Sequence, residues 1–232
     1  MKIDICIPAF NEEKIIVEAT GAVRDALGKI AGSEFRIIVA DNGSTDKTAA
    51  LAGKCEGVSV LSLSVRGKGA AVVAAAKASE ADIFGFIDAD LSADPRDITK
   101  ILSPIARSEC DISIGSRLID KRTVRREWLR TLSSVLFNIL RRAILGVSVA
   151  DTQCGLKLMN GKGREVMRRC TERGWFFDME FLARAERAGL ALREIPINWD
   201  EHRFAGRASK LNLLRDSIGA VRAMIRIRRS VI

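Results

Sequence analysis

Short runs of β-branched and other hydrophobic residues alternate with helical patterns along the first half of the chain, and this alternation restricts the fold more than any other feature. The runs predict buried strands at 3–7, 35–40, 58–63, 83–87 and 112–115. Strands that alternate with helices form a mostly parallel sheet with helices on both faces. We therefore expect an α/β fold that binds its ligands at the carboxyl ends of the strands.

One helix after the fourth predicted strand has a clear hydrophobic face. Pro95 is suited to its first turn, and Pro104 is expected to bend or end it early. The residues of the predicted face follow the i, i+3, i+4, i+7 pattern: Ile98, Ile101, Leu102 and Ile105.

The second half of the chain has a different pattern. It predicts helices at about 128–145, 162–171 and 178–188, a turn at 151–155, a strand at about 192–197 and a basic helix at the end. The chain contains no internal repeat and no low-complexity tract.

The net charge of +9 is concentrated in two segments. Residues 115–150 carry a net charge of +6 and residues 203–232 carry +7, so the rest of the chain is acidic. Localised basicity predicts an anionic partner such as a membrane surface, a phosphate group or nucleic acid. Neither basic segment has the interleaved aromatic residues that stack on bases, so we do not expect nucleic acid.

The cysteines and the hydropathy pattern concern the location of the chain. The five cysteines are far apart and form no CxxC pair, and the single histidine, His202, makes a zinc site improbable. No apolar run reaches about 18 residues, and no signal-like segment opens the chain. We therefore expect reduced thiols and a cytoplasmic chain that is soluble or peripheral on the membrane.

Polar turns follow each of the first four predicted strands, at 8–12, 41–46, 66–69 and 88–90. Asp88 and Asp90 are one residue apart after a buried strand, so both carboxylates can bind one Mg²⁺ or Mn²⁺ ion that bridges phosphate oxygens. The alternative is that Asp88 and Asp90 are ordinary turn residues with no role in metal binding. The hydrophobic strand before them and the other polar turns favour the metal site.

The other strand-end turns give weaker signals. The Asp41 carboxylate can accept a hydrogen bond from a nucleotide base, or it can form an Asx turn or cap a helix. Asp46 is better suited to capping. Lys68 lies between Gly67 and Gly69, where the backbone could approach a phosphate, although the stretch matches no known phosphate loop.

Basic residues of the second half could form an anion pocket, because guanidinium groups pair with phosphate in a bidentate manner. The candidates are Arg117, Arg130, Ser134 and Arg203. The alternative for each arginine is a solvated charged face. The final helix, with apolar residues from 211 to 225, could lie in a membrane surface or pack on the domain, and its sequence fits both.

With these residues in place, the chain resembles the family 2 glycosyltransferases, and among them the polyprenyl-phosphate sugar transferases typified by dolichyl-phosphate mannose and glucose synthases. Residues 5–13 look like the nucleotide-binding start of that family, 41–46 like its second motif and 88–90 like its metal motif. In the second half, residues 151–158, 175–180, 198–199 and 209–210 look most like the glucose branch.

The resemblance implies a single glycosyltransferase A-type domain over residues 1–202, with a nucleotide-sugar-binding half at about 1–115, an acceptor half at about 116–202 and a basic helical segment at 203–232. It implies Mg²⁺ or Mn²⁺ on Asp88 and Asp90. The implied nucleotide-sugar-binding residues are Pro8, Phe10, Glu12, Asp41, Lys68, Asp88, Ala89 and Asp90. The implied acceptor-phosphate residues are Arg117, Arg130, Ser134 and Arg203, and the implied catalytic residues are Asp88, Asp90, Arg117 and Arg130.

Three features depart from the family pattern. Asn42 stands where the family usually has a second acid, and residues 90–92 look more like the mannose branch. No membrane-spanning segment is expected, so attachment to the cytoplasmic face of an anionic membrane would depend on the basic helices.

The function expected from these features is transfer of a hexose, with inversion, from a nucleotide sugar to a polyprenyl or dolichyl phosphate. UDP-glucose is the favoured donor and GDP-mannose the second. Other readings are transfer to a sugar hydroxyl, with Asp178 or Glu180 as the base, a phosphatase of the haloacid dehalogenase type, and a module that binds nucleotide sugar without catalysis.

Overall fold

The structure, a computed structural model, describes residues 1–119, 141–200 and 213–231. Three residues singled out above, Arg130, Ser134 and Arg203, lie outside the described residues, as does most of the helix expected at 128–145. The statements below concern the described part of the chain.

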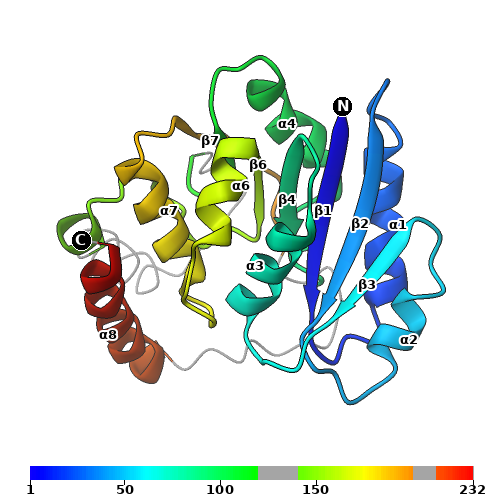
Figure 1. Cartoon of the computed structure of the whole chain (residues 1–232), viewed down its shortest axis with the longest axis horizontal. Coiled ribbons are helices and arrows are strands. Elements are labelled where there is room, and N and C mark those ends of the chain that lie inside the picture. The colour runs from blue at the N-terminus through cyan, green and yellow to red at the C-terminus, as the bar shows by residue number, and fades with distance from the viewer. Residues whose placement is uncertain (120–140, 201–212, 232) are drawn as a thin grey trace.

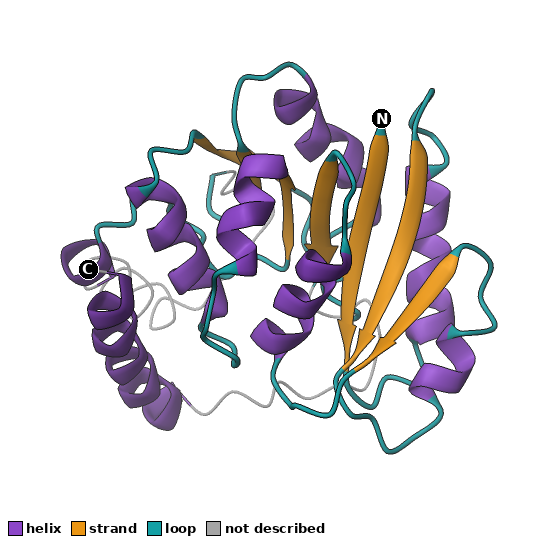
Figure 2. Ribbon diagram, viewed as in Figure 1, coloured by secondary structure: helices purple, strands orange, loops and turns teal. Residues whose placement is uncertain are grey.

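A seven-stranded sheet forms the centre of the molecule, in the order β3-β2-β1-β4-β6-β5-β7. Only β6 is antiparallel to its neighbours among these strands. The strands β1 to β3 converge at their carboxyl ends, near the lower edge of the view (Figure 2). The strands are β1 (Lys2–Ala9), β2 (Glu34–Asp41), β3 (Val58–Ser62), β4 (Ile83–Ile87), β5 (Ile112–Ser116), β6 (Leu156–Asn160) and β7 (Leu192–Pro196).

Helices cover both faces of this sheet (Figure 1). One hydrophobic core lies between the sheet and α1 (Ile16–Leu27), α2 (Thr48–Ala52) and α4 (Ile98–Ala106). The other lies between the sheet and α3 (Lys68–Ala78), α6 (Gly161–Arg168) and α7 (Phe177–Arg187). The α/β architecture expected from the alternating pattern is therefore confirmed.

The helix after Pro95 differs in one respect from its prediction. Pro95 opens a short 3₁₀ turn, η1 (Pro95–Asp97), which Asp94 caps by accepting a hydrogen bond from the Arg96 backbone N–H. The predicted hydrophobic face of α4 is buried. The helix includes Pro104 and ends at Ala106, two residues later. Pro104 lies in the last turn of a short helix, where few hydrogen bonds remain to be lost.

Strand β6 was not expected from the sequence. It begins directly after the predicted 151–155 turn and pairs with β4 on one side and β5 on the other. Its second residue is Lys157, whose side chain is fully buried. A lysine in the second position and an asparagine in the last leave too short a hydrophobic run to identify a buried strand.

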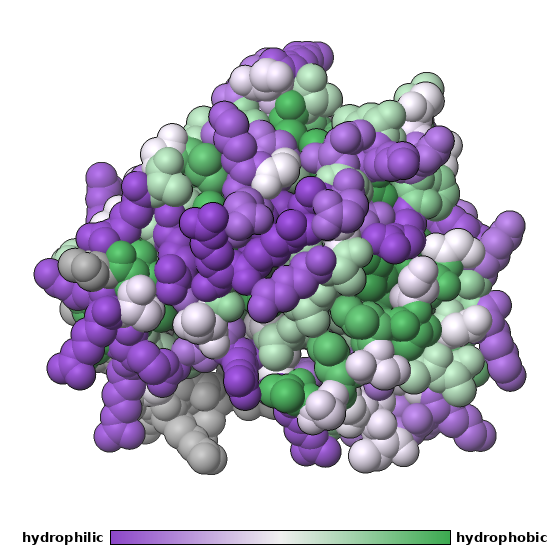
Figure 3. Space-filling view, viewed as in Figure 1, coloured by the Kyte–Doolittle hydropathy of each residue, from purple (hydrophilic) through white to green (hydrophobic). Residues whose placement is uncertain are grey.

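The last helix, α8 (Leu213–Val231), packs against α7 in the part whose side chains are described. Met224 and Ile227 are buried against the core that α3, α6 and α7 share, and Ala223 is also buried. The opposite face is basic, and hydrophilic residues cover α6 and α8 on this side of the molecule (Figure 3). Within the described residues, no helix is both long and apolar enough to cross a membrane.

Candidate active site

The polar turns at the ends of β1 to β4 meet at one edge of the sheet, as their positions in the sequence predicted. The Lys68 Nζ lies 2.6 Å from Asp88 Oδ1, which joins the start of α3 to the end of β4. The Gly67 N–H donates to Asn42 Oδ1 at 2.9 Å, which joins the same turn to the end of β2. The Asn11 N–H donates to Ser44 Oγ at 2.9 Å, which links the turns after β1 and β2.

Asp88 and Asp90 follow β4, all five residues of which are buried. The Asp88 N–H donates to the Gly155 carbonyl at 3.0 Å, so the turn before β6 fixes the backbone at this point. A Cβ atom on Gly155 would lie 2.2 Å from Asp88 Oδ2. Only glycine therefore lets Asp88 keep its position. Asp90 Oδ1 accepts from the Ser92 N–H at 3.0 Å, which orients the second carboxylate.

The two carboxylates are suited to a divalent cation that also binds a substrate. The described residues contain no cluster of three or more His, Cys, Asp or Glu side chains that could hold a metal alone. Mg²⁺ is commonly bound by one or two carboxylates together with substrate phosphates. Asp88 already carries a cation, the Lys68 ammonium, against its carboxylate. The pair is 23% and 11% exposed, so it is partly open to solvent.

Lys68 lies among three aromatic rings. Its Nζ is 5.9 Å from the ring centre of Phe86, 5.4 Å from that of Trp175 and 5.8 Å from that of Phe177. Burial disfavours the charged ammonium, but Asp88 and the nearby acids outweigh it and raise the pKa of Lys68. Lys68 is therefore a fixed positive charge beside Asp88.

The glycines around Lys68 have a different role from the one predicted. A Cβ on Gly67 would lie 2.0 Å from the Arg173 carbonyl oxygen, and one on Gly69 would lie 2.4 Å from that of Glu172. The N–H groups of Gly69 and Ala70 donate to carbonyls of the 173–174 segment. The backbone at the start of α3 thus packs on another loop, so of this turn it is the Lys68 side chain that can meet a phosphate.

Asp41 and Asn42 end β2 and differ in what they bind. Asp41 is 6% exposed, and within the described residues its Oδ1 has no hydrogen-bond partner. This favours a ligand N–H over the Asx turn as its partner. Asp46 forms an Asx-type turn at the start of α2, because its Oδ1 accepts from the Thr48 N–H at 2.9 Å. Asn42 holds Gly67 through its carbonyl oxygen, an acceptor that the acid usual in the family would also supply.

The remaining predicted donor-side residues lie at the same edge. Pro8 is in β1, and the backbone N–H of Glu12 donates to Thr48 Oγ1 at 2.7 Å. Phe10 is 36% exposed, with the Arg66 guanidinium 4.9 Å above its ring. Ala89, between the two aspartates, is 5% exposed. Arg66 was not singled out from the sequence, since a lone arginine before a glycine carries no distinctive pattern.

Arg117 lies directly after β5 and forms a bidentate pair with Asp151. Its Nε donates to Oδ2 at 2.8 Å, and one terminal nitrogen donates to Oδ1 at 2.7 Å. The guanidinium also lies 4.6 Å from the ring centre of Trp199. The pair with Asp151 occupies guanidinium N–H groups that Arg117 would also need to bind a phosphate in a bidentate manner. The role of Arg117 at the acceptor phosphate stays a prediction, as do those of Arg130, Ser134 and Arg203.

The two acids considered as bases for a hydroxyl acceptor are buried. Asp178 is 2% exposed and pairs with Lys157, the Nζ of which is 2.5 Å from its Oδ1. Glu180 is fully buried and accepts from the Thr171 and Glu172 N–H groups at 2.9 and 2.6 Å. Both carboxylates therefore have structural partners. The Lys157–Asp178 pair was missed because Lys157 belongs to the strand that was not expected.

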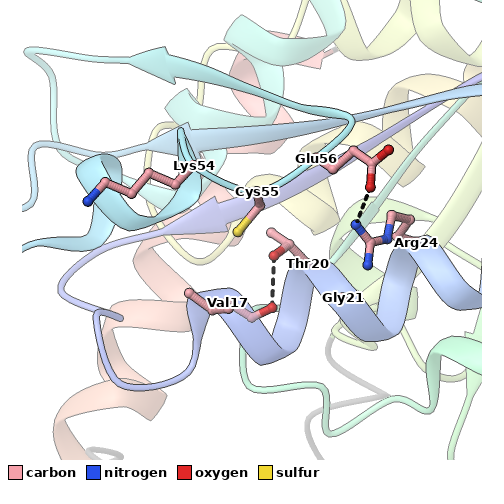
Figure 4. Close-up of a pocket in the computed structure, with 7 residues that line it drawn as sticks. All are labelled: Val17, Thr20, Gly21, Arg24, Lys54, Cys55 and Glu56. Carbon is pink, nitrogen blue, oxygen red and sulfur yellow. Dashed lines mark hydrogen bonds and ion pairs between the residues drawn. The ribbon is translucent and has the colours of Figure 1, made fainter.

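A shallow pocket elsewhere does not belong to this site. It has a volume of 270 Å³ and lies between α1 and the 54–56 segment that leads into β3 (Figure 4). That segment is at the amino end of β3, away from Asp88. An ion pair between Arg24 and Glu56 closes one side. Lys54 and Cys55 also line the pocket, but it lies apart from the polar turns at the ends of β1 to β4.

The chain is similar to known glycosyltransferases over most of its length. The model of glycosyl transferase family 2 matches residues 4–164. Dolichyl-phosphate beta-glucosyltransferase from Saccharomyces cerevisiae is 30% identical over 97% of this chain and 74% of that protein. Glycosyltransferase AglD from Haloferax volcanii is 29% identical over 94% of this chain but only 36% of that protein. The chain thus spans about a third of the Haloferax protein.

Solved structures resemble the fold as well. Glucosyl-3-phosphoglycerate synthase from Mycobacterium tuberculosis, in complex with Mn²⁺, uridine diphosphate and phosphoglyceric acid, superposes with a TM-score of 0.70. The superposition covers 99% of this chain and 78% of that chain, with 23% sequence identity. At this identity the likeness concerns the fold.

Proposed function

The chain belongs to glycosyl transferase family 2, and from this premise we propose that it transfers glucose from UDP-glucose to a polyprenyl phosphate of the dolichyl type, with inversion at the anomeric carbon. The relatives that match almost the whole chain support the lipid acceptor and the sugar, since several are named dolichyl-phosphate beta-glucosyltransferase. The acceptor and donor are thus proposed from sequence similarity, and the chemistry is argued from the site.

One observation carries the donor half of the proposal: two carboxylates and a lysine converge after β4. Asp88 and Asp90 offer hard oxygen ligands, and Lys68 offers a positive charge 2.6 Å from Asp88. A diphosphate leaving group gains negative charge as the sugar bond breaks, and fixed positive charge stabilises that change. A bound Mg²⁺ or Mn²⁺ would supply further charge to the same phosphates.

The acceptor half of the proposal follows from the absence of an open base among the candidates. A phosphomonoester has a second pKa of about 6, so its oxygen is already nucleophilic near neutral pH. A sugar hydroxyl would need a general base within reach. Asp178 and Glu180 are both buried in structural hydrogen bonds. The described part of the site is thus better suited to a phosphate acceptor than to a hydroxyl served by either acid.

The membrane side of the proposal depends on α8. Its exposed residues include Arg222, Arg228, Arg229 and one apolar residue, Ile225, while Met224 and Ile227 face the protein. Arginines near an anionic bilayer each add attraction that salt screens. We expect peripheral binding on the cytoplasmic face through charge, without deep insertion of this helix.

The proposal is tested by product formation in an organic phase. The purified chain is incubated with Mn²⁺, a short polyprenyl phosphate and labelled UDP-glucose, and with GDP-mannose in parallel. We expect lipid-extractable label from UDP-glucose, and a loss of about 10³-fold in Asp88→Asn and Asp90→Asn, because a metal ligand supplies several kcal/mol of transition-state stabilisation. Asp25→Asn, an exposed acid on α1, is the control. Undiminished transfer by both site variants would refute the metal role.

A further inference from the structure

Lys68 occupies the position in which a cation is expected at the candidate metal site. Its ammonium is 2.6 Å from Asp88 Oδ1, a contact that a divalent ion would also need. Lys68 and a metal ion are therefore competitors for the same carboxylate. A lysine that served only to bind phosphate would not need to touch Asp88.

The surroundings hold Lys68 at this position. The Gly67 and Gly69 backbone packs against the 172–174 segment so closely that no Cβ fits, which fixes the backbone on both sides of Lys68. The rings of Phe86, Trp175 and Phe177 surround the ammonium at 5.4 to 5.9 Å. Rings attract a cation through their faces. Only the Lys68 side chain, and not its backbone, is left free to move away from Asp88.

The local charge balance explains why such a lysine is useful. Three acids, Asp88, Asp90 and Asp178, lie close enough to Lys68 to affect its charge. Lys157 neutralises Asp178, so Lys68 faces the two acids that follow β4 with a single positive charge. A divalent cation alone would leave an excess of positive charge in this small space, and a diphosphate alone would leave an excess of negative charge. Together they restore the balance.

We propose that Lys68 is the resident counter-ion of Asp88, so that this site binds a divalent cation tightly only when a nucleoside diphosphate binds with it and takes over the Lys68 charge. The inference rests on the proposed function, because it assumes a metal-bound diphosphate donor. In this proposal the Lys68 ammonium would leave Asp88 and pair with the phosphates of the donor when Asp88 holds a metal ion. Metal and donor thereby favour each other's binding.

The alternative role for Lys68 makes a different prediction for the metal alone. If Lys68 were only a phosphate ligand, its loss would weaken nucleotide binding and leave metal binding unchanged. If Lys68 competes with the metal, its loss strengthens metal binding in the absence of nucleotide. Removal of Lys68 would then weaken nucleotide binding but strengthen binding of the metal alone.

The test is a titration of the full chain with Mn²⁺ alone, followed by free Mn²⁺ in electron paramagnetic resonance or by calorimetry, and then repeated with UDP present. We expect Lys68→Met to bind Mn²⁺ alone about tenfold tighter than the unmodified protein, since a full charge next to Asp88 is removed. The factor by which UDP tightens Mn²⁺ binding should fall about tenfold. Lys77→Met, on the exposed side of the same helix, should change neither value.

Further variants separate the two proposals. Asp88→Asn should abolish Mn²⁺ binding, and Mn²⁺ binding that survives it would count against the metal site and the proposed function. If Asp88→Asn abolishes binding but Lys68→Met binds Mn²⁺ alone no tighter than the unmodified chain, the counter-ion role is wrong and the proposed function stands. Lys68→Gln repeats the test should the methionine variant not fold, and Lys68→Arg, which keeps the charge, should bind Mn²⁺ alone as weakly as the unmodified chain.

Discussion

Two lysine–aspartate pairs lie near Phe86, and they differ in exposure. In the inner pair, Lys157 and Asp178 are 0% and 2% exposed, and the Lys157 ammonium also donates to the Cys154 carbonyl at 2.7 Å. In the outer pair, Lys68 and Asp88 are 11% and 23% exposed, at the end of β4. Both ammonium groups lie within 6 Å of the Phe86 ring centre.

The difference in exposure distinguishes an ion pair that stabilises the fold from one that can take part in ligand binding. The inner pair is closed to solvent, so its charges can only neutralise each other and hold β6 to α7. The outer pair can exchange its partners with a ligand, since one side of it is open. The same residue types, one strand apart, therefore serve the fold in one case and the candidate site in the other.

The largest expected effect is on stability, at the inner pair. Asp178→Asn leaves the Lys157 ammonium buried without a counter-charge, and removing one partner of a buried pair typically costs about 3–5 kcal/mol. The free energy of unfolding, measured in urea, should fall by about this amount. Asp88→Asn should lower it by less than about 1 kcal/mol, because solvent and Lys68 rearrangement can compensate at a partly exposed pair.

A double variant tests whether charge is the cause. Lys157→Met with Asp178→Leu removes both charges and should recover part of the stability lost in Asp178→Asn, because a well-packed apolar pair carries no desolvation cost. A double variant that is as unstable as the single one would indicate that packing, and not the unpaired charge, dominates. Equal losses in Asp178→Asn and Asp88→Asn would remove the distinction between the two pairs.

The next effect tests how the outer pair is positioned. In Gly155→Ala the added Cβ would lie 2.2 Å from Asp88 Oδ2, so either the Asp88 side chain or the turn must move. Overpacking of this kind typically costs about 1–3 kcal/mol of stability. We expect an additional loss of Mn²⁺ and UDP binding, which calorimetry would measure, because Asp88 can no longer keep its orientation.

A matched glycine provides the control. A Cβ on Gly21, in α1, would meet no atom within 4 Å. Gly21→Ala should therefore stabilise the protein slightly, by about 0.5–1 kcal/mol, since alanine is favoured over glycine inside a helix. Unchanged Mn²⁺ binding in Gly155→Ala would show that Asp88 is not positioned by this contact.

The sequence was sufficient to single out Asp88, Asp90 and Lys68 as candidate site residues but not the contact between Lys68 and Asp88. Asp88 and Asp90 could be found because they follow a fully hydrophobic strand, and local patterns of this kind survive folding. Asp41 was found as a candidate for the same reason. The contact between Lys68 and Asp88 depends on β3 and β4 ending at the same edge, with the separation fixed by packing that no local pattern encodes.

The inner pair shows why the rest was missed. Lys157 and Asp178 are 21 residues apart in sequence, and neither charge fits the hydrophobic pattern of a buried element. The glycines beside Lys68 had a plausible local explanation, close approach to a phosphate, whereas their actual neighbour is a loop more than 100 residues away. Burial of a charge is decided by its partner, and partners that are distant in sequence are seen only in the fold.

A third pair, Arg117 with Asp151, has an intermediate exposure and offers the smallest expected effect. Asp151 is 3% exposed and Arg117 is 21% exposed. Burial raises the pKa of the Asp151 carboxyl, but the hydrogen bonds and charge of Arg117 outweigh it and hold the pKa below its usual range. The folded chain therefore binds this proton less readily than the unfolded chain, so the stability that Asp151 contributes is complete above about pH 4 and is lost as the pH falls through the folded-state pKa.

Comparison with Asp151→Asn isolates this contribution. The unmodified protein should exceed the variant in unfolding free energy at pH 7, by on the order of 1 kcal/mol because Arg117 is partly solvated, and the excess should shrink below about pH 4. Urea unfolding at pH 7, 5, 4 and 3 measures it. An excess that stays constant across this range would mean that Asp151 acts through hydrogen bonds that both the carboxylate and the protonated acid make and asparagine does not. The Arg117–Asp151 pair would then differ from the inner pair, whose contribution to stability is expected to depend on charge.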